Sequence, residues 1–354
     1  MRDLDALPVV FHHEVSEVGG DHTLLDTLNR PMRDLRVSVM DRCNLRCSYC
    51  MPADSGPFDF VRTPQRLSFE ETDRLVRIIA RLGVRKIRIT GGEPLLRPRL
   101  PELIRRLRQI GELDEIALTT NGVLLARNAT ALASAGLTRV TVSLDSLDEK
   151  VFGRMNGGRA RTDSVLAGIN EANNAGLGPI KINVVVQRGV NDHTVLDLLG
   201  HFRHSGHIVR MIEYMDAGTR NRWRPDEVVP TMELIERIDA RWPIRQVPAH
   251  YAGEVASRYE YEDGAGEIGF ISSISQPFCR DCHRIRLSTD GILYTCLFAT
   301  SGTNLRDPLR AGASDSELET IISRVWKIRQ DRYSELRASG INRQDKVEMY
   351  RVGG

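Results

Sequence analysis

The sequence of 354 residues lacks a long apolar run and carries almost no net charge. No stretch approaches the roughly 18 apolar residues that a membrane-spanning helix needs, so we expect no membrane association. The 49 Lys and Arg residues nearly balance the 47 Asp and Glu residues, which gives a formal charge of +2. This balance gives no whole-chain argument for binding nucleic acid. A hydrophobic content of 41% is ordinary for a soluble enzyme.

The first thirty residues lack the features of a targeting segment. A secretory signal has an apolar centre, and an organelle transit peptide contains few acidic residues. This stretch is mixed and carries acidic residues throughout, namely Asp3, Asp5, Glu14, Glu17, Asp21 and Asp26. We therefore expect a cytoplasmic protein, with residues 1–30 as a loosely held N-terminal extension.

Cysteine is scarce, but it is clustered. The six cysteines fall into two groups of three with none left over: Cys43, Cys47 and Cys50, then Cys279, Cys282 and Cys296. An even count is typical of disulfide frameworks in short secreted proteins, whereas this chain is long and shows no signal. Clustered thiols in such a chain indicate metal ligands.

The first group has the spacing C-x3-C-x2-C, with Tyr49 just before the third cysteine. Three thiolates on one tight loop suit a cuboidal iron–sulfur cluster, which normally takes four, so one iron stays open to a ligand that is not protein. Two alternatives are three cysteines packed as small hydrophobes and a zinc knuckle. The flanks are polar, which disfavours the first. No fourth Cys or His follows at the usual spacing, which disfavours the second.

The loop at 40–52 resembles the signature of radical S-adenosylmethionine (SAM) enzymes. The resemblance implies that the open iron binds the amino and carboxylate groups of SAM. It further implies that the reduced cluster splits the sulfonium to give a 5′-deoxyadenosyl radical. Many enzymes with different substrates share this motif, so the substrate must be argued from other residues.

Six predicted strands alternate with helices between residues 35 and 214. The strands are expected at 35–39, 86–90, 115–119, 139–144, 180–186 and 208–214. Ser68 with Glu71 forms a capping-box pattern that opens a helix closed by Gly83, and further helices are expected near 100–110, 123–135, 163–175 and 193–204. This alternation predicts a parallel sheet with right-handed crossovers. Six units are too few for the usual eight-stranded barrel. The predicted fold class is therefore α/β, an open, partial (β/α)6 TIM-like barrel over 31–216.

After about residue 217 the composition changes to short, irregular pieces punctuated by Trp and Pro. We expect residues 217–354 to form a C-terminal second-cluster region ending in Gly353-Gly354. Within it, Ser314 with Glu317 predicts another capped helix, running through Trp326 toward Arg329.

In parallel α/β folds the functional groups gather at the carboxyl ends of the strands. We therefore expect one site there. Its members would be the first cysteine loop, Gly91-Gly92, Thr119-Thr120-Asn121, Ser143, Lys181 and Met215.

The second cysteine group has the spacing C-x2-C-x13-C. From spacing alone a zinc site with His283 as fourth ligand stays open. The flanking residues, from Phe278 through Ser288, then Gly291 and Leu297-Phe298, resemble the second-cluster motif of the MoaA family. These are the GTP 3′,8-cyclases of molybdenum cofactor biosynthesis. The resemblance runs from about Arg30 to the end of the chain. It includes Asp34-Leu35-Arg36, Ile89-Thr90-Gly91-Gly92-Glu93-Pro94, Val142-Ser143-Leu144-Asp145 and Lys181-Ile182-Asn183. It departs from the pattern at Met40 and in the Gly- and Arg-rich stretch 153–162.

The resemblance implies ligand contacts residue by residue. For SAM the implied contacts are Tyr49 at the adenine, Gly92 at the methionyl amine, and Ser143 and Met215 near the adenosine. For GTP they are Arg36, Arg88, Thr119, Lys181, Arg210, Arg284, Ile285 and Arg286. Arginine forks match phosphate oxygens, although most arginines on a protein are simply solvated. No Walker-type phosphate loop is present, and a nucleotide that is rearranged and not hydrolysed does not need one.

A terminal Gly353-Gly354 is ordinarily a frayed tail. The resemblance implies instead that the tail reaches into the active site, where two glycines can thread a narrow channel. With Arg284 and Arg286 they form the implied catalytic group.

The resemblance implies two [4Fe–4S] clusters, with the second open iron contacting the guanine of GTP. The adenosyl radical would take the ribose 3′ hydrogen, and the carbon radical would attack C8. The product would be (8S)-3′,8-cyclo-7,8-dihydroguanosine 5′-triphosphate, the substrate of a MoaC-type synthase of cyclic pyranopterin monophosphate. An electron donor is also required. The oligomeric state stays open, a homodimer included. The alternatives are another twin-cluster radical SAM enzyme, for example one that modifies a peptide, and a non-enzymatic zinc protein.

Overall fold

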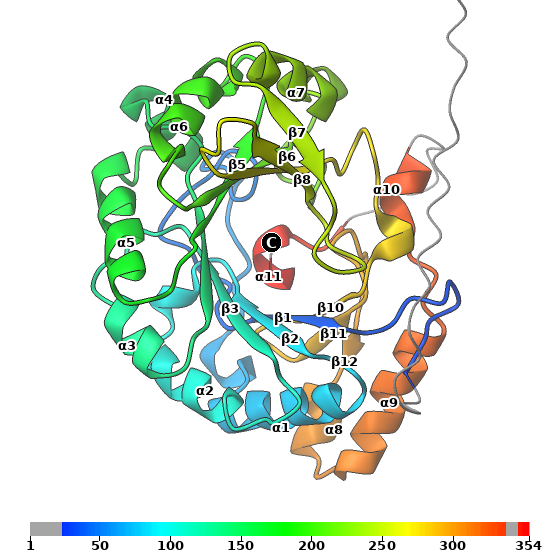
Figure 1. Cartoon of the computed structure of the whole chain (residues 1–354). Helices are drawn as coiled ribbons and strands as arrows, with labels where there is room; N and C mark the ends of the chain where they lie inside the picture. The colour runs from blue at the N-terminus through cyan, green and yellow to red at the C-terminus, as the bar shows by residue number, and fades with distance from the viewer. Residues whose placement is uncertain (1–22, 338–345, 354) are drawn as a thin grey trace, which may run out of the picture.

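The computed structural model describes residues 23–337 and 346–353, and these form one twelve-stranded sheet with helices around it (Figure 1). The strand order is β12-β11-β10-β1-β2-β3-β4-β5-β6-β9-β8-β7. The strands are β1 (Asp34–Ser38), β2 (Lys86–Thr90), β3 (Glu115–Thr120), β4 (Arg139–Ser143), β5 (Lys181–Val186), β6 (Ile208–Glu213), β7 (Ile244–Val247), β8 (Ser257–Tyr261), β9 (Glu267–Ile271), β10 (Arg284–Leu287), β11 (Ile292–Tyr294) and β12 (Thr303–Asn304).

Strands β1 to β6 pair in parallel in the order of the sequence, so the predicted open partial barrel is confirmed. Each of the six predicted strands agrees with an observed strand to within one residue at either end. The strands after residue 217 were not predicted. Among them β9 joins β6 in parallel and β10 joins β1 in parallel, while antiparallel strands extend both edges. The second cysteine group therefore lies on segments that flank β10 and β11, in the same sheet as β1, which precedes the first group.

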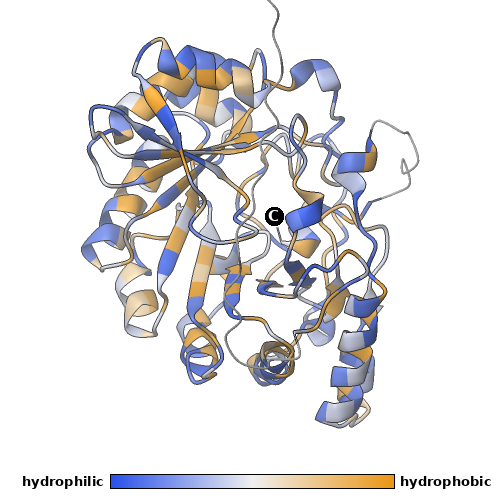
Figure 2. Cartoon of the chain, turned by 45° about the vertical axis from the view of Figure 1, so that its right-hand side comes forward, coloured by the Kyte–Doolittle hydropathy of each residue, from blue (hydrophilic) through white to orange (hydrophobic). Residues whose placement is uncertain are grey.

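The helices of the described chain lie mainly on the outside of the sheet (Figure 1). They are α1 (Phe69–Arg81), α2 (Leu100–Leu107), α3 (Ala129–Ser134), α4 (Glu149–Asn156), α5 (Thr162–Asn174), α6 (Val195–Phe202), α7 (Thr231–Asp239), α8 (Arg306–Arg310), α9 (Asp315–Lys327), α10 (Tyr333–Leu336) and α11 (Met349–Val352). In Figure 2 the outer helices carry both hydrophobic and hydrophilic residues, as expected for helices packed on one side.

Local sequence signals explain several helix boundaries. Ser68 and Ser314 both form complete capping boxes, at the starts of α1 and α9, as predicted. The helix expected near 123–135 is wrong in its first half, because regular helix begins only at Ala129. Helix α4 was missed, although Asp148 caps its start and Gly157, with φ of 75°, ends it.

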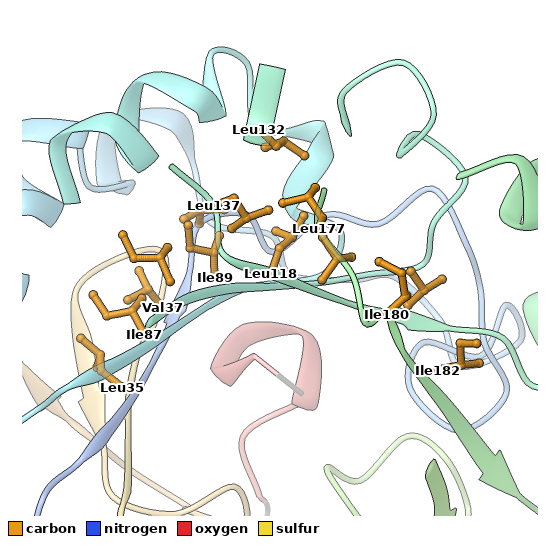
Figure 3. Close-up of a cluster of buried hydrophobic side chains, with 14 of the residues drawn as sticks. Leu35, Val37, Ile87, Ile89, Leu118, Leu132, Leu137, Leu177, Ile180 and Ile182 are labelled. Carbon is orange, nitrogen blue, oxygen red and sulfur yellow. The ribbon is translucent and has the colours of Figure 1, made fainter. Parts of the chain in front are cut away.

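The core lies between the sheet and the outer helices. Leu35 and Val37 of β1 and Ile87 and Ile89 of β2 are buried there, with side chains from the next strands and helices (Figure 3). Because side chains alternate along a strand, the residues between these apolar positions point to the inner face. Helix α11 lies on that inner face, at the centre of the barrel (Figures 1 and 3).

The expectation of a loosely held N-terminal extension is wrong for residues 23–30. Asp26 and Arg30 are buried and form an ion pair of 2.6 Å. Residues 1–22 lie outside the described residues. None of the described helices is both long and apolar enough to cross a membrane.

Candidate active site

A single cavity of about 310 Å³ brings the two cysteine groups together inside the barrel. All six cysteines are free and line it. Most of the other predicted site residues line it as well: Arg36, Tyr49, Arg88, Gly92, Thr119, Ser143, Lys181, Arg210, Met215, Arg284 and Arg286. The lining of the cavity therefore combines thiols and cations, a chemistry that suits more than one kind of ligand.

The first cysteine group lies on the loop after β1. The amides of Cys50 and Met51 donate to the carbonyl of Cys47, at 3.0 and 2.8 Å, which makes a tight turn between the second and third thiols. Cys43 Sγ accepts from the amide of Leu45 at 3.4 Å. Burial raises the pKa of Cys43 to about 11, so the free thiol keeps its proton at neutral pH and exchanges it when it binds a metal. Three thiols on one turn facing a cavity fit a cluster that leaves one iron open.

The glycines of the Gly91-Gly92-Glu93-Pro94 turn lie directly against this loop. The amide of Gly92 donates to the carbonyl of Met40 at 2.6 Å. A Cβ on Gly92 would lie 2.5 Å from the carbonyl oxygen of Arg42, and one on Gly91, with φ of 153°, would lie 2.1 Å from that of Met40. Glycine is required here because two stretches of backbone meet with no room for a side chain.

Tyr49 is held by a buried acid that the sequence analysis did not assign to the site. Its hydroxyl donates to Asp145 Oδ2 at 3.0 Å, and the amide of Val185 donates to Asp145 Oδ1 at 2.9 Å. Burial raises the pKa of Asp145 to about 6. The position of Asp145, two residues after the end of β4, was the available signal for its role.

The second cysteine group is framed by arginines. Cys282 Sγ accepts from Arg284 Nη2 at 3.4 Å and from Arg329 Nη2 at 3.3 Å. Burial alone raises the pKa of Cys282, but the two guanidiniums outweigh it and bring the pKa down to about 6. His283, the fourth ligand of the zinc alternative, lies against Gly253, where a Cβ would be 2.6 Å from its Nδ1. Three thiols facing the cavity thus form a second donor set suited to a cluster.

A row of arginines crosses three neighbouring strands. Arg36 of β1 is the register partner of both Arg286 of β10 and Arg88 of β2. Like charges placed opposite one another destabilise a sheet. Burial, followed by the charge of Arg286, lowers the pKa of Arg36. The buried Nε atoms of Arg36 and Arg284 have no hydrogen-bond partner within the described chain. Clustered cations with unused donors fit a polyanion.

Lys181 is the first residue of β5, so it lies at the amino end of its strand. The expectation that it belongs with the carboxyl-end groups is wrong. Lys86 and Arg139, which sequence analysis did not assign to the site, begin β2 and β4 and line the same part of the cavity. Both could have been found from the alternation of polar and apolar residues along their strands. Each is followed by an apolar residue that faces the outer core, which leaves the cation on the inner face. The cavity thus runs along the strands, from the cysteine loop to a group of cations at the amino ends.

Two predicted contacts are placed differently from the rest. Ile285 does not line the cavity: its side chain is buried in the apolar core, so a ligand contact there would have to use its backbone. Gly354 lies outside the described residues. The carbonyl of Gly353 accepts a hydrogen bond from Arg286 Nη1, which brings the C-terminal tail to the arginine row.

An open, partly parallel β/α barrel with a three-cysteine loop after its first strand defines a radical SAM protein. The Radical SAM superfamily model matches residues 37–202, and the model "Molybdenum Cofactor Synthesis C" matches residues 207–335. Together these family models cover most of the chain.

Curated relatives define the family more closely. The chain is 53% identical over 330 residues to a GTP 3′,8-cyclase of Xanthomonas campestris pv. campestris, covering 93% of this chain and 97% of the relative. It is 53% identical over 331 residues to a GTP 3′,8-cyclase of Acidothermus cellulolyticus, covering 91% of each chain. A Staphylococcus carnosus GTP 3′,8-cyclase is 44% identical over 337 residues, covering 94% of this chain and 99% of the relative. The chain belongs to the GTP 3′,8-cyclase family, which confirms the resemblance drawn from the sequence.

Solved structures agree on the fold. Streptococcus suis SuiB bound to S-adenosylmethionine aligns with a TM-score of 0.58 at 14% identity, covering 82% of this chain and 69% of that one. SuiB bound to its precursor peptide SuiA aligns with a TM-score of 0.57 at 15% identity, covering 87% and 67%. Cofactors of the family are SAM and two [4Fe–4S] clusters, and the two thiol groups supply the donors that these clusters need.

Proposed function

We propose that this protein converts GTP to (8S)-3′,8-cyclo-7,8-dihydroguanosine 5′-triphosphate in molybdenum cofactor biosynthesis. One observation carries the proposal: a single cavity joins both cysteine groups to a row of arginines with unused donors. Its relatives are named for this activity and cover nearly the whole chain.

Cys43, Cys47 and Cys50 would hold the first cluster, and Cys279, Cys282 and Cys296 the second. When bound, these cofactors supply the 5′-deoxyadenosyl radical and an iron site for the guanine base. The chain itself supplies position and exclusion of water.

At the carboxyl end of the strands, SAM would contact Tyr49, Gly92, Ser143 and Met215. The hydrogen bond from Tyr49 to Asp145 fixes the ring against the cavity wall, which orients it for an adenine. The backbone of Gly92 is the part of the turn that can reach a ligand, because the loop opposite allows no side chain.

At the amino ends, the triphosphate would be held by Arg36, Arg88, Lys181, Arg210 and Arg286, with Thr119 and the backbone of Ile285 as further nucleotide contacts. Arg88 is already directed by hydrogen bonds of 3.1 Å from its Nη1 to Thr119 Oγ1 and Thr141 Oγ1. Arg210 is directed by Asn183, whose Oδ1 accepts from Nη2 at 2.7 Å. Guanidiniums fixed in this way lose little entropy on binding phosphate.

The cavity separates the two ends, so a nucleotide bound by its phosphates at one end presents its ribose toward the other. Arg284, Arg286, Gly353 and Gly354 would complete the site around the reacting sugar and base. Replacing Gly354 with a bulky residue should suppress turnover and leave the iron content unchanged.

We also propose a cellular location, domain bounds and partners for the protein. We place the protein in the cytoplasm, with a barrel over 31–216 and a second-cluster region over 217–354. Its product would pass to a MoaC-type synthase of cyclic pyranopterin monophosphate. A low-potential electron donor would serve it, and a homodimer would be compatible with an active site contained in one chain.

The test is anaerobic turnover of the reconstituted protein with SAM and a strong reductant, comparing GTP, ATP and no nucleotide. Mass spectrometry follows 5′-deoxyadenosine and a nucleotide isomeric with GTP. The product keeps the mass of GTP because the hydrogen lost from C3′ is replaced by one electron and one proton. We expect 5′-deoxyadenosine and the cyclised product in the sample with GTP, and neither in the samples with ATP or without nucleotide.

Two cysteine variants sharpen this test. Cys47→Ser should abolish SAM cleavage, whereas Cys296→Ser should lose the cyclised product and leave the first cluster in place. SAM cleavage that is equal with and without GTP, and yields no nucleotide product, would instead point to another substrate such as a peptide.

A further inference from the structure

A buried ionic network lies behind the second cysteine loop. Asp26, Arg30 and Arg329 are 5%, 1% and 4% exposed. Asp26 Oδ2 lies 2.6 Å from Arg30 Nε and 3.4 Å from Arg329 Nη1. Asp331, whose side chain is 31% exposed, is a second acid at Arg329, with its Oδ2 3.4 Å from Nε. Asp26 is therefore the fully buried counter-charge that the two guanidiniums share, and Arg329 also has a partly exposed one.

The network joins the two ends of the described chain. In Figure 1 the first described residues lie beside the orange helix α9, and the hydroxyl of Thr27 donates to the carbonyl of Arg329 at 2.6 Å. Trp326 of α9, fully buried, donates from Nε1 to the carbonyl of Arg30 at 3.1 Å. Its ring also lies under the Arg329 guanidinium, 4.5 Å from ring centre to Cζ. The guanidinium plane of Arg329 is thus fixed from below by the ring and from the side by Asp26.

Both halves of the C-x2-C turn receive hydrogen bonds from this network. Arg30 Nη1 donates to the carbonyl of Cys279 at 2.7 Å. Arg329 Nη1 donates to the carbonyl of Cys282 at 2.7 Å, and its Nη2 donates to Cys282 Sγ at 3.3 Å. Arg329 is therefore oriented toward a cluster-binding sulfur by contacts on three sides.

We propose that Arg329 is a positioning residue for the second cluster, and that its N–H···S hydrogen bond to Cys282 raises the reduction potential of that cluster. Hydrogen bonds to the sulfurs and nearby positive charge stabilise the more negative, reduced state. Asp26 opposes this effect, since its carboxylate partly neutralises Arg329 at a distance of 3.4 Å. The inference goes beyond GTP cyclisation and depends only on the presence of the second cluster.

Removing the cation and removing its counter-charge should act in opposite directions. Arg329→Met keeps an unbranched, flexible side chain and leaves Asp26 paired with Arg30, so no fully buried charge is orphaned. It should lower the midpoint potential of the second cluster. Asp26→Asn removes the buried counter-charge and leaves Arg329 only the partly exposed Asp331 at 3.4 Å, so it should raise the midpoint potential. A general loosening of the packing would shift both variants the same way.

The measurement is a redox titration followed by electron paramagnetic resonance. It uses the full chain with Cys43, Cys47 and Cys50 replaced by Ala in every sample, so that only the second cluster gives a signal. For Arg329→Met we expect the one-electron reduction equilibrium to fall about tenfold, which is about 59 mV. The matched control is Arg324→Gln, an exposed arginine of α9, the helix that ends two residues before Arg329.

A midpoint for Arg329→Met equal to that of the control would overturn the proposal, as would Arg329→Met and Asp26→Asn moving together. Arg329→Lys keeps the charge and a donor, so it should recover most of the midpoint and of the iron content. Failure of this rescue would also overturn the proposal. Because no GTP and no turnover are involved, the result is independent of whether GTP is the substrate.

Discussion

The guanidinium of Arg286 donates a hydrogen bond to the backbone carbonyl of Gly353, the last described residue of the chain. The same Nη1 lies 3.3 Å from the carbonyl of Val352. Arg286 is also the register partner of Arg36 in the arginine row. The position of the tail and the orientation of the proposed phosphate-binding cations are therefore linked through one side chain.

Replacing Gly353 with Ala should abolish most turnover. A Cβ there would lie 2.3 Å from Thr90 Cγ2, and the φ of 74° already disfavours any residue with a side chain. The tail would have to leave its place beside Arg286. We expect at least a tenfold loss of cyclised product with iron content and fold unchanged, as checked by anaerobic turnover, iron analysis and circular dichroism.

Thr90→Ser supplies the control, because it removes Cγ2 and keeps the hydroxyl. In the double variant with Gly353→Ala, part of the activity should return, while the backbone strain at position 353 remains. Full activity in Gly353→Ala alone would show that the tail does not need this position.

The C-terminal tail, which follows α11 (Met349–Val352), is held in place by aromatic residues that come after the first cysteine loop. The ring of Tyr350, 2% exposed, packs edge-on against Phe58 and Phe60, with centroid distances of 5.8 and 6.0 Å. Glu348 also accepts hydrogen bonds from the backbone and hydroxyl of Thr219, at 3.1 and 2.7 Å. Helix α11 has only four residues, so tertiary packing must hold it.

Tyr350→Ala should therefore release the tail. Removing a buried aromatic ring costs roughly 3 kcal/mol or more, which corresponds to a loss of docked tail on the order of a hundredfold. Tyr350→Phe keeps the ring and should retain most turnover. Arg351→Ala is a second control, because its partner Asp59 is 91% exposed and such pairs contribute little. Limited proteolysis of the C-terminus measures release, and equal cleavage of the Ala and Phe variants would contradict the assignment.

Much of the cysteine loop and the barrel was predictable because their signals are local. The spacing of Cys43, Cys47 and Cys50 fits one turn, and the capping boxes at Ser68 and Ser314 need only four residues each. Strands such as β5 alternate over a long enough stretch to be recognised. The approximate position of the arginine row also followed from family motifs.

Other features depend on contacts between distant parts of the chain. Strand β10 pairs with β1 although about 250 residues separate them, and its four residues alternate over too short a stretch to be recognised. Arg30 reaches the second cysteine site through the carbonyl of Cys279, and Asp26 reaches it through Arg329, and both partners are far away in the sequence. Lys181 was placed at the wrong strand end because its side chain was assigned to a motif without regard to where β5 starts.

We expect Glu93 to stabilise the folded protein and not to bind SAM directly. It is fully buried and does not line the cavity. Its carboxylate accepts from Thr120 Oγ1 at 2.7 Å, from the amide of Asn121 at 2.8 Å and from the amide of Leu95 at 2.9 Å. It therefore ties the glycine turn to the end of β3.

Glu93→Ala leaves these buried donors without an acceptor, at a cost of roughly 3 kcal/mol. Glu93→Gln keeps one oxygen and should cost less. Urea unfolding of the apoprotein gives both values. A Glu93→Ala variant of unchanged stability but much weaker SAM binding would mean that the carboxylate binds SAM directly.

The affinity for GTP should weaken as the pH rises above about 7, because Lys181 loses its charge. Burial, and then the charge of Arg210, lowers the pKa of Lys181 to about 7 in the free protein. Arg139 and Lys86 act in the same direction, and Glu254 opposes them. A bound triphosphate favours the ammonium form and so raises this pKa. Binding therefore takes up a proton above about pH 7, and the affinity falls by at most about tenfold per pH unit.

Lys181→Arg is the matched control, because a guanidinium stays protonated over this range. The phosphates of GTP also titrate near neutral pH, but this contribution is common to both proteins and cancels in their ratio. We expect the KM for GTP of the wild type, divided by that of Lys181→Arg, to rise between about pH 7 and about pH 9. A ratio that stays flat would place Lys181 away from the triphosphate, whereas a ratio that falls would mean that the neutral amine is the form that binds.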